Sequence, residues 1–425
     1  MTLSIPRAAD GRSAPPGRRA HVDARTWPDV AHPPKARPGH PAVARLLLER
    51  ALAGMPLRVR LGHRPPSGSG PSLVVHEPDA FFRRIGAQGL IGFGESYMAR
   101  EWDSDDLPGL LAVLAARVDD LVPAPLRRLR GAWARRRPEA HRNTVAGARE
   151  NVRRHYDLSN DLFALFLDDT MTYSSAVFRA FPARRESLED AQHRKIDQLL
   201  DLAAVGPGVR LLEIGTGWGE LALRAAGRGA RVVTVTLSAE QRDLARRRIA
   251  DAGLTDRVEV RLRDYREVRG AYDAVVSVEM IEAVGADFWP AYFAALSDNT
   301  APGGRIALQT ITMEHARMLD TARTHTWISK YVFPGGLIPS REAVETHAAG
   351  AGLRVASDHG YGDHYAETLR LWREQFTDAV ESVAALGFDD TFRRMWELYL
   401  AYSEAGFRSR YLDVRQLLLT KETVR

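Results

Sequence analysis

The chain has 425 residues, of which 45% are hydrophobic, a formal net charge of +5 and no cysteine. This length predicts two or three domains, and the hydrophobic fraction is enough to fill ordinary cores. The lack of cysteine excludes disulfides, thiolate nucleophiles and cysteine-zinc sites, and we expect no metal. Because there is no run of eighteen apolar residues and no apolar signal segment, we expect a cytoplasmic protein that is at most peripheral on the inner face of the membrane.

Four regions follow one another along the chain. Residues 1–41 are rich in Pro, Arg and Ala without apolar periodicity, which predicts a disordered tail. Residues 42–122 should form a small α+β domain that binds lipid or a partner, with an amphipathic helix (VARLLLERAL), a strand pair around HRPPSGSGPS and two more helices. A basic linker is expected at 123–149, and the catalytic domain at 150–425.

A glycine-rich turn follows an apolar strand in the segment LLEIGTGWGE, at Leu211–Glu220. Gly215, Gly217 and Gly219 let the backbone bend sharply and approach a ligand, and the helix that begins there offers free N–H groups. This pattern is typical of a nucleotide-binding turn, although such glycines also occur in plain tight turns.

Three further strands end on polar residues after this turn. RVVTVTL ends at Thr236-Leu237-Ser238, VEVRLRD ends at Asp264-Tyr265, and YDAVVSVEM ends at Glu279-Met280. The later segments GRIALQTITM, LRVASDHGY and YLDVRQLLLTK predict the remaining strands. The fold class is therefore α/β, with a Rossmann-like, mostly parallel sheet that holds its ligand at the carboxyl ends of the strands.

Five sequence blocks carry a family resemblance, in the order HYDLSNDLFALFLDDTMTYSSAVF, VTLSAEQ, SVEMIEAVG, YVFPGGLIPS and YLAYSEAGF. Together they resemble the cyclopropane-fatty-acyl-phospholipid synthase family of S-adenosylmethionine-dependent methyltransferases. The segment Gly92–Leu110 is similar to the amino-terminal domain of the long, phospholipid-acting members. The resemblance implies a class I methyltransferase fold with a helical, aromatic insertion that binds an acyl chain, and methyl transfer to the double bond of an unsaturated (oleoyl-type) phospholipid.

The resemblance also implies a set of cofactor-binding residues. Glu213 and the three glycines suit the amino-acid end of the cofactor, and Asp264 with Tyr265 suits the adenine. The residues expected to bind the ribose lie at the end of the second strand and after it: Thr236, Leu237, Ser238 and Gln241. Two further residues are expected to close over the methionine part of the cofactor, Tyr173 and Ser174. The structural alternative is that Ser238 caps a helix and that Asp264 caps a turn.

The reaction implied by the family sets the catalytic residues. An alkene that attacks a sulfonium methyl becomes a carbocation, so the enzyme needs a dry apolar site, groups that stabilise positive charge, and one base. Tyr365 lies in the segment that supplies the family's active-site tyrosine. Glu282 is the preferred carboxylate facing the cation and Glu279 a helix-capping or supporting acid, with an exchange of these two roles left open. Most aromatic residues of the last hundred are expected to be core.

The chain departs from the family at the base. The family holds a bicarbonate ion with a cysteine, a glutamate, a histidine, a backbone group and a tyrosine. The matching positions here are Ser175, Glu282, Gln309, Ile311 and Tyr365. Serine for cysteine is unremarkable in a chain without cysteine, but glutamine cannot offer an anion the charge of histidine, and Ala283 replaces a second histidine. Bicarbonate binding is therefore left open.

Loss of both histidines favours a second family branch. In that branch a hydride shift precedes proton loss, and the product is a 10-methylene acyl chain that a separate reductase converts to 10-methylstearate. The alternative product is the cyclopropane ring. Homo-oligomerisation is left open.

A basic cluster allows one reading from another class. Its members are Arg127, Arg128, Arg130, Arg135, Arg136, Arg137 and Arg142. Such a cluster suits a nucleic-acid methyltransferase, anionic lipid or simply a solvated helix face. The chain has no NPPY-like or Pro-Cys motif for base methylation, so we expect anionic membrane and no nucleic acid as partner.

Overall fold

The computed structural model describes residues 22–33, 35–118, 138, 143–144, 147, 159–322 and 324–421. These residues fall into two compact units. The amino-terminal unit contains the described residues up to 118 together with 326–331 and 372–410, and the sheet unit contains the rest. The arginine cluster of the predicted linker lies outside the described residues.

The first described residues correct the prediction of a disordered tail. Helix α1 (Pro28–Ala31) forms within it. Trp27 and Val30 are buried in the amino-terminal unit, and the Trp27 indole donates a hydrogen bond to Asp389 at 2.8 Å. Burial of these two apolar side chains, together with a hydrogen bond from the Arg84 guanidinium to the Val30 carbonyl at 2.6 Å, anchors this segment. The average composition of the tail does not reveal these contacts.

The amino-terminal unit is built around a three-stranded sheet in the order β1-β2-β3. The strands are β1 (Arg58–Leu61), β2 (Ser72–Val75) and β3 (Trp102–Asp103), and the predicted pair β1-β2 is parallel. Four helices accompany them: α2 (His40–Ala53), α3 (Pro78–Gln88), α4 (Leu90–Met98) and α5 (Leu107–Ala116).

Two later segments belong to the same unit, although the sequence analysis placed them in the catalytic domain. They contain α17 (Trp327–Tyr331), residues 372–378 of α19 (Gly362–Asp378), α20 (Val380–Ala385) and α21 (Asp390–Arg408). Helix α21 buries an apolar face that includes Phe392, Met395 and Trp396, and it packs on α4 and α5. Its sequence predicts an amphipathic helix but does not say what the apolar face covers.

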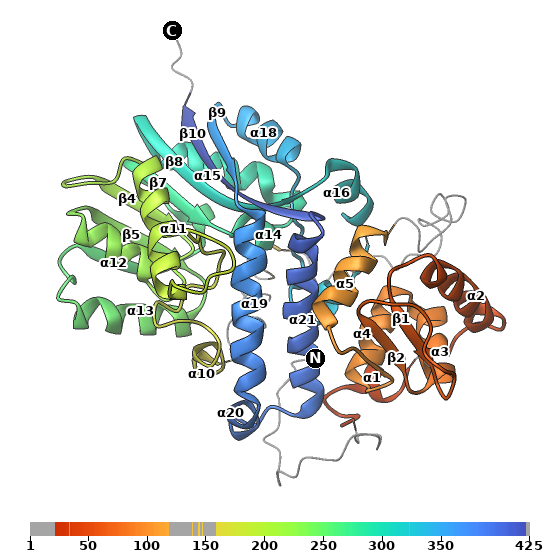
Figure 1. Ribbon diagram of the computed structural model, residues 1–425. Helices are drawn as coiled ribbons and strands as arrows, with labels where there is room; N and C mark the ends of the chain where they lie inside the picture. Colours follow the sequence, from red (N-terminus) through yellow and green to blue (C-terminus); the bar gives the residue numbers. More distant parts are fainter. Residues whose placement is uncertain are drawn as a thin grey trace. The chain divides into compact units, whose positions relative to one another are not determined.

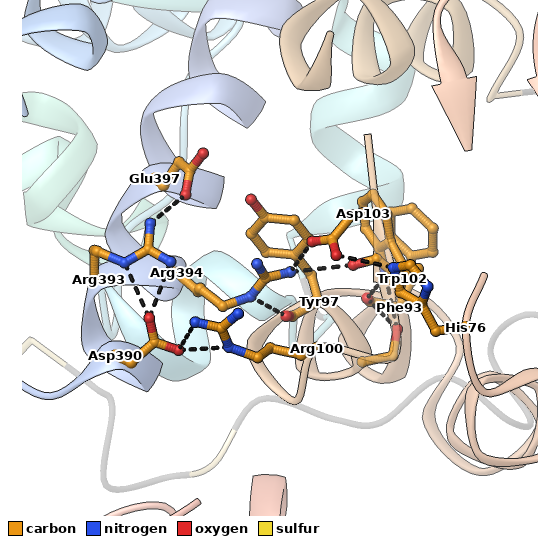
Figure 2. Close-up of polar contacts among 11 residues, drawn as sticks. His76, Phe93, Tyr97, Arg100, Trp102, Asp103, Asp390, Arg393, Arg394 and Glu397 are labelled. Carbon is orange, nitrogen blue, oxygen red and sulfur yellow. Dashed lines mark hydrogen bonds and ion pairs between the residues drawn. The ribbon is translucent and has the colours of Figure 1, made fainter. Parts of the chain in front are cut away.

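Polar contacts within this unit fix α21 to β3 and α4, as Figure 2 shows for Arg394. The Arg394 guanidinium lies 3.8 Å from the centroid of the Tyr97 ring and donates to the Tyr97 carbonyl at 2.6 Å and to Asp103 at 2.7 Å. Because Arg394 is only 4% exposed, these contacts replace water almost completely and hold the helix in register.

The sheet unit contains a seven-stranded sheet in the order β6-β5-β4-β7-β8-β10-β9 (Figure 1). The strands are β4 (Arg210–Ile214), β5 (Arg231–Thr236), β6 (Val258–Leu262), β7 (Tyr272–Val278), β8 (Thr300–Met313), β9 (Leu353–Gly360) and β10 (Leu412–Lys421). Neighbours from β6 to β8 are parallel, whereas β10 pairs antiparallel with both β8 and β9. The mostly parallel sheet is confirmed.

The strand order reverses between β4 and β7. From β4 the chain runs outward to β5 and β6, then returns to β7 on the other side of β4 and continues to β8. Such a switch point leaves a crevice at the carboxyl ends of the strands, where α/β sheets bind ligands. The glycine turn follows β4 directly, so the topology brings it to this crevice.

Helices cover both faces of this sheet. Leu211 and Val276 belong to a core with α11 (Leu188–Leu202), α12 (Glu220–Gly227) and α13 (Ala239–Asp251). Leu212 and Val275 belong to a second core with α15 (Trp289–Asn299) and α18 (Arg341–Gly350). Alternate residues of a strand thus enter opposite cores, as a buried parallel sheet requires. Among the described residues, no helix is both long and apolar enough to cross a bilayer.

Candidate active site

Two of the three glycines in the turn after β4 serve different purposes. Gly219 is the N-cap of α12 with φ +96°, and a Cβ there would lie 3.1 Å from the Ala245 Cβ of α13. This glycine therefore allows two helices to pack closely. Gly217 has φ +52°, and a Cβ there would meet no atom within 4 Å. Gly217 faces open space in a cavity, so a ligand can approach its backbone.

That cavity lies within the sheet unit at the carboxyl ends of β4, β5 and β7. Nine of the twelve predicted cofactor residues line it: Tyr173, Ser174, Glu213, Gly215, Gly217, Thr236, Leu237, Gln241 and Tyr265. The other three, Gly219, Ser238 and Asp264, do not. The crevice expected from the strand order is thus a real cavity.

Ser238 and Asp264 act as the caps that the structural alternative describes. The Ser238 hydroxyl accepts from the Gln241 N–H at 3.2 Å, at the start of α13. Asp264 is fully buried, caps the turn Tyr265–Glu267, and pairs with the Arg266 guanidinium at 2.6 Å. Arg266 itself lines the cavity, over the Tyr265 ring. The expected adenine contact of Asp264 therefore competes with an arginine only two residues along the chain.

Glu213 gives the cavity a buried carboxyl group with one oxygen that has no partner among the described residues. Its side chain is 3% exposed, and its Oε2 has no hydrogen-bond partner among the described residues. Burial raises the pKa of Glu213 to about 8, against weaker opposing effects of Thr234 and Lys195. A buried carboxylate oxygen without a partner suits an ammonium group, such as that of a bound amino acid.

Lys195 is a cavity residue that the sequence analysis did not single out. It lies on the buried face of α11, 1% exposed, and donates to the Ser174 hydroxyl at 2.6 Å. One signal was available: the chain has 59 basic residues, yet Lys195 is one of only four lysines, Lys35, Lys195, Lys330 and Lys421.

Glu279 collects three of the five predicted catalytic residues. Its carboxylate accepts from the Ser175 N–H at 2.9 Å, the Gln309 amide at 2.8 Å and the Tyr365 hydroxyl at 2.6 Å. The backbone of Glu279 has φ +49°, an unusual value for a residue other than glycine. Burial raises its pKa, while its three donors and Lys195 oppose that rise. Glu279 is therefore the centre of the cluster.

The contacts of Gln309 and Ser175 refine the prediction for these residues. The side-chain carbonyl of Gln309 accepts a hydrogen bond from the side-chain amide of Gln416, on β10, at 3.0 Å. This contact turns the side-chain NH2 of Gln309 toward Glu279. Gln416 could not be identified from the sequence, because only the pairing of β8 with β10 brings it opposite Gln309. The Ser175 hydroxyl donates to the Ala176 carbonyl at 3.0 Å, so Ser175 serves the cluster through its backbone.

Glu282 lies in a second, neighbouring arrangement on α14 (Ile281–Val284). Its Oε1 accepts from the Ile311 N–H at 2.5 Å and the Thr310 hydroxyl at 2.9 Å, and its Oε2 has no partner among the described residues. Burial, followed by repulsion from Glu279, raises the pKa of Glu282 to about 8. Glu279 thus accepts hydrogen bonds from three of the predicted catalytic residues, although it was predicted only as a supporting acid. Glu282 accepts a hydrogen bond from one of them, Ile311.

The sheet with helices on both faces, the glycine turn and the cavity at the switch point define a class I S-adenosylmethionine-dependent methyltransferase. The open space at Gly217 and the unpaired Glu213 oxygen fit the amino-acid end of that cofactor. The chain belongs to the family described as Mycolic acid cyclopropane synthetase, whose sequence pattern matches residues 144–417.

Individual relatives extend this assignment over nearly the whole chain. Tuberculostearic acid methyltransferase UfaA1 of Mycobacterium tuberculosis is 54% identical over 415 residues, covering 95% of this chain and 97% of that protein. Cyclopropane-fatty-acyl-phospholipid synthase of Escherichia coli (strain K12) is 33% identical over 361 residues, covering 84% and 89%. The structure of mycolic acid cyclopropane synthase CmaA1 complexed with SAH and CTAB matches with a TM-score of 0.58 and 30% identity, covering 67% of this chain and 99% of that one.

Proposed function

We propose that the protein transfers a methyl group from S-adenosylmethionine to the double bond of an unsaturated phospholipid acyl chain, and that the product is a methylene-branched chain. One observation carries the choice of product: the Glu279 carboxylate receives the Ser175 N–H, Gln309 and Tyr365. The same positions match ligands of bicarbonate in the cyclopropane synthases that the sequence resembles. A carboxylate has the charge and the planar oxygens of bicarbonate, so Glu279 can take the place of that ion.

The relatives support the substrate class. One is named for tuberculostearic acid and another for a fatty-acyl phospholipid, so a lipid acyl chain is the substrate common to both names. The oleoyl chain, attachment to the anionic inner face of the membrane through the basic linker at 123–149, and a reductase that consumes the product are further parts of the proposal.

The cavity residues divide the work of binding. Glu213 and the backbone at Gly215 and Gly217 hold the amino-acid end of the cofactor, Thr236 and Gln241 its ribose, and Tyr265 with Arg266 its adenine. Bound S-adenosylmethionine supplies a methyl group on a positively charged sulfur. The carboxylates of Glu279 and Glu282 place negative charge where the cation develops on the acyl chain.

Glu279 removes the proton that the methylated acyl chain must lose. The alkene electron pair forms the new carbon–carbon bond to the methyl group, while the bond between that methyl group and the cofactor's sulfur breaks and its electron pair stays on the sulfur. A cation is left on the neighbouring alkene carbon, to which a hydride then moves from the methylated carbon. Glu279 accepts a proton from the new methyl group, whose C–H electron pair becomes the second bond of the C=CH2 branch. Burial raises the pKa of Glu279, which makes its carboxylate a stronger proton acceptor than an exposed one.

Product analysis tests the proposal. The protein is incubated with dioleoyl phospholipid in anionic vesicles and with cofactor carrying a ¹³C-labelled methyl group, and the extracted lipid is examined by NMR. Labelled vinylidene signals are expected. Upfield cyclopropane ring signals as the sole product would overturn the choice of product, and absence of label from lipid would overturn the substrate.

A further inference from the structure

One wall of the cofactor cavity is formed by residues 172–174, and two buried polar side chains of helix α11, Gln192 and Lys195, donate hydrogen bonds to it. Gln192 is 0% exposed and donates to the Ser174 carbonyl at 2.8 Å and to the Thr172 carbonyl at 3.3 Å. One turn later, Lys195 donates to the Ser174 hydroxyl at 2.6 Å. Gln192 thus binds only the backbone of this wall, whereas Lys195 adds a charge at the side chain that faces the cavity.

The ammonium group of Lys195 makes fewer hydrogen bonds among the described residues than it has donors. A lysine has three N–H donors, and among the described residues the hydrogen bond of Lys195 goes to the neutral Ser174 hydroxyl. The acids that face it come from three separate parts of the chain: Asp168 lies in a loop, Glu213 on β4, and Glu279 directly after β7. Burial lowers the pKa of Lys195 to about 8, and these three acids oppose the change. The cavity therefore contains a buried cation with donors to spare.

The cofactor has a group that needs such a cation. Its amino-acid end carries an ammonium and a carboxylate, and Glu213 suits only the ammonium. Two other cations line the cavity, Arg263 and Arg266. Arg263 is exposed at the end of β6, and Arg266 is paired with Asp264 beside Tyr265. Lys195 is the buried cation on the side of Ser174 and Glu213.

We propose that Lys195 is a specificity-determining residue that recognises the free carboxylate of the cofactor, together with the Ser174 hydroxyl that it orients. This role depends on cofactor binding and not on which lipid product forms, so a cyclopropane product would leave it intact. Glu213 and Lys195 then bind the two opposite charges of the amino-acid end, which fixes its orientation in the cavity.

The test compares S-adenosylhomocysteine with its decarboxylated analogue, which keeps the amine and lacks only the carboxylate. Binding of both to the full-length protein is measured by calorimetry. Lys195→Met should weaken S-adenosylhomocysteine roughly ten- to hundredfold, since a charge-assisted hydrogen bond is lost, and the analogue by less than about threefold. Gln192→Met is the matched reference, because it removes contacts to the same wall without removing charge and should affect both ligands equally.

If Lys195→Met weakened the binding of both ligands equally, Lys195 would only hold the cavity wall in place, and the proposal would be overturned. Unchanged binding of both ligands would overturn it as well. A measurement on the unmodified protein covers the case in which the variant does not fold. Since the pKa of Lys195 lies near 8, the preference for the carboxylate-bearing ligand should shrink from pH 7 to pH 9.5. A preference that stays constant over this range would also overturn it. In Lys195→Arg, which keeps its charge, the preference should persist to the higher pH.

Discussion

The substitution Glu279→Gln removes the charge at the centre of the catalytic cluster and keeps the size of the side chain. Three donors point at this carboxylate, from Ser175, Gln309 and Tyr365, at 2.6 to 2.9 Å. An amide must turn its NH2 group toward at least one of them, so about 1.5 to 3 kcal/mol of charge-assisted hydrogen bonding is lost. Removal of a buried charge offsets part of this loss, so the variant should remain folded.

The effect on turnover should be much larger, because the proton acceptor is gone. Loss of a general base costs roughly 10²- to 10⁴-fold, which corresponds to about 3 to 5 kcal/mol of barrier. The assay measures kcat with oleoyl phospholipid and labelled cofactor, together with S-adenosylhomocysteine affinity by calorimetry. We expect kcat to fall by this factor while the affinity changes by less than about threefold.

Two comparisons make the result specific. Glu240→Gln makes the same chemical change at an exposed position in the first turn of α13 and should leave kcat unaltered. Glu282→Gln should reduce kcat less than Glu279→Gln, because Glu282 contributes charge without accepting the proton. If Glu279→Gln retained kcat within about threefold of the parent, or if Glu282→Gln were the more damaging change, Glu279 would not be the base.

A glycine at the same position gives a complementary prediction. The φ of +49° at Glu279 is a conformation that glycine adopts without strain, so Glu279→Gly should fold well while leaving its three donors without an anion. Added bicarbonate should then restore part of the activity by occupying the vacated position. Lack of rescue at any bicarbonate concentration, in a variant that still binds S-adenosylhomocysteine, would contradict the equivalence of the two anions.

Three further outcomes test other parts of the molecule. Gly217→Ala should weaken S-adenosylhomocysteine roughly tenfold in calorimetry, since its Cβ enters the cavity. Gly253→Ala, at φ +67° with equally open space outside the cavity, should not, and equal affinities would contradict this use of Gly217. Because burial raises the pKa of Glu213 to about 8 from its ordinary 4.5, the folded state keeps a proton that the unfolded state releases, and stability should fall as pH rises through this interval. Thermal unfolding should show a shallower fall for Glu213→Gln, and an identical pH slope would refute this cause. Arg394→Leu should lower the free energy of unfolding by about 2 to 4 kcal/mol in denaturant titrations, because it leaves buried carbonyls unpaired. Arg45 is half-exposed, so Arg45→Leu should lower the free energy of unfolding by less than about 1 kcal/mol. Equal losses in the two variants would contradict a stabilising role for the buried Arg394 contacts in Figure 2.

Much of the fold could be predicted because local patterns determine it. Apolar strands that end on polar residues, and a glycine turn between a strand and a helix, predicted the sheet and the position of its ligand cavity. The assignment of α21 to the amino-terminal unit could not be predicted, because an amphipathic face is compatible with many partners. Trp27 and Val30 were missed for a related reason, since tertiary packing orders a segment whose composition is typical of disorder.

The active site shows the same division between local and distant information. The resemblance identified Ser175, Gln309 and Tyr365 correctly as neighbours, because their positions follow the family motif. It did not place Glu279 at their centre, which depends on a left-handed backbone conformation after β7 that the sequence does not reveal. Lys195 and Gln416 reach the site from α11 and β10, and only the packing of those elements makes their side chains functional.

The most direct test of Glu279 as the base is the bicarbonate dependence of the unmodified protein. Product is followed by NMR with labelled cofactor and oleoyl phospholipid, in buffer freed of carbonate and again with bicarbonate added. If Glu279 takes the place of the ion, vinylidene product should form at the same rate in both buffers. A rate that depends on bicarbonate, with cyclopropane signals replacing the vinylidene signals, would contradict that role.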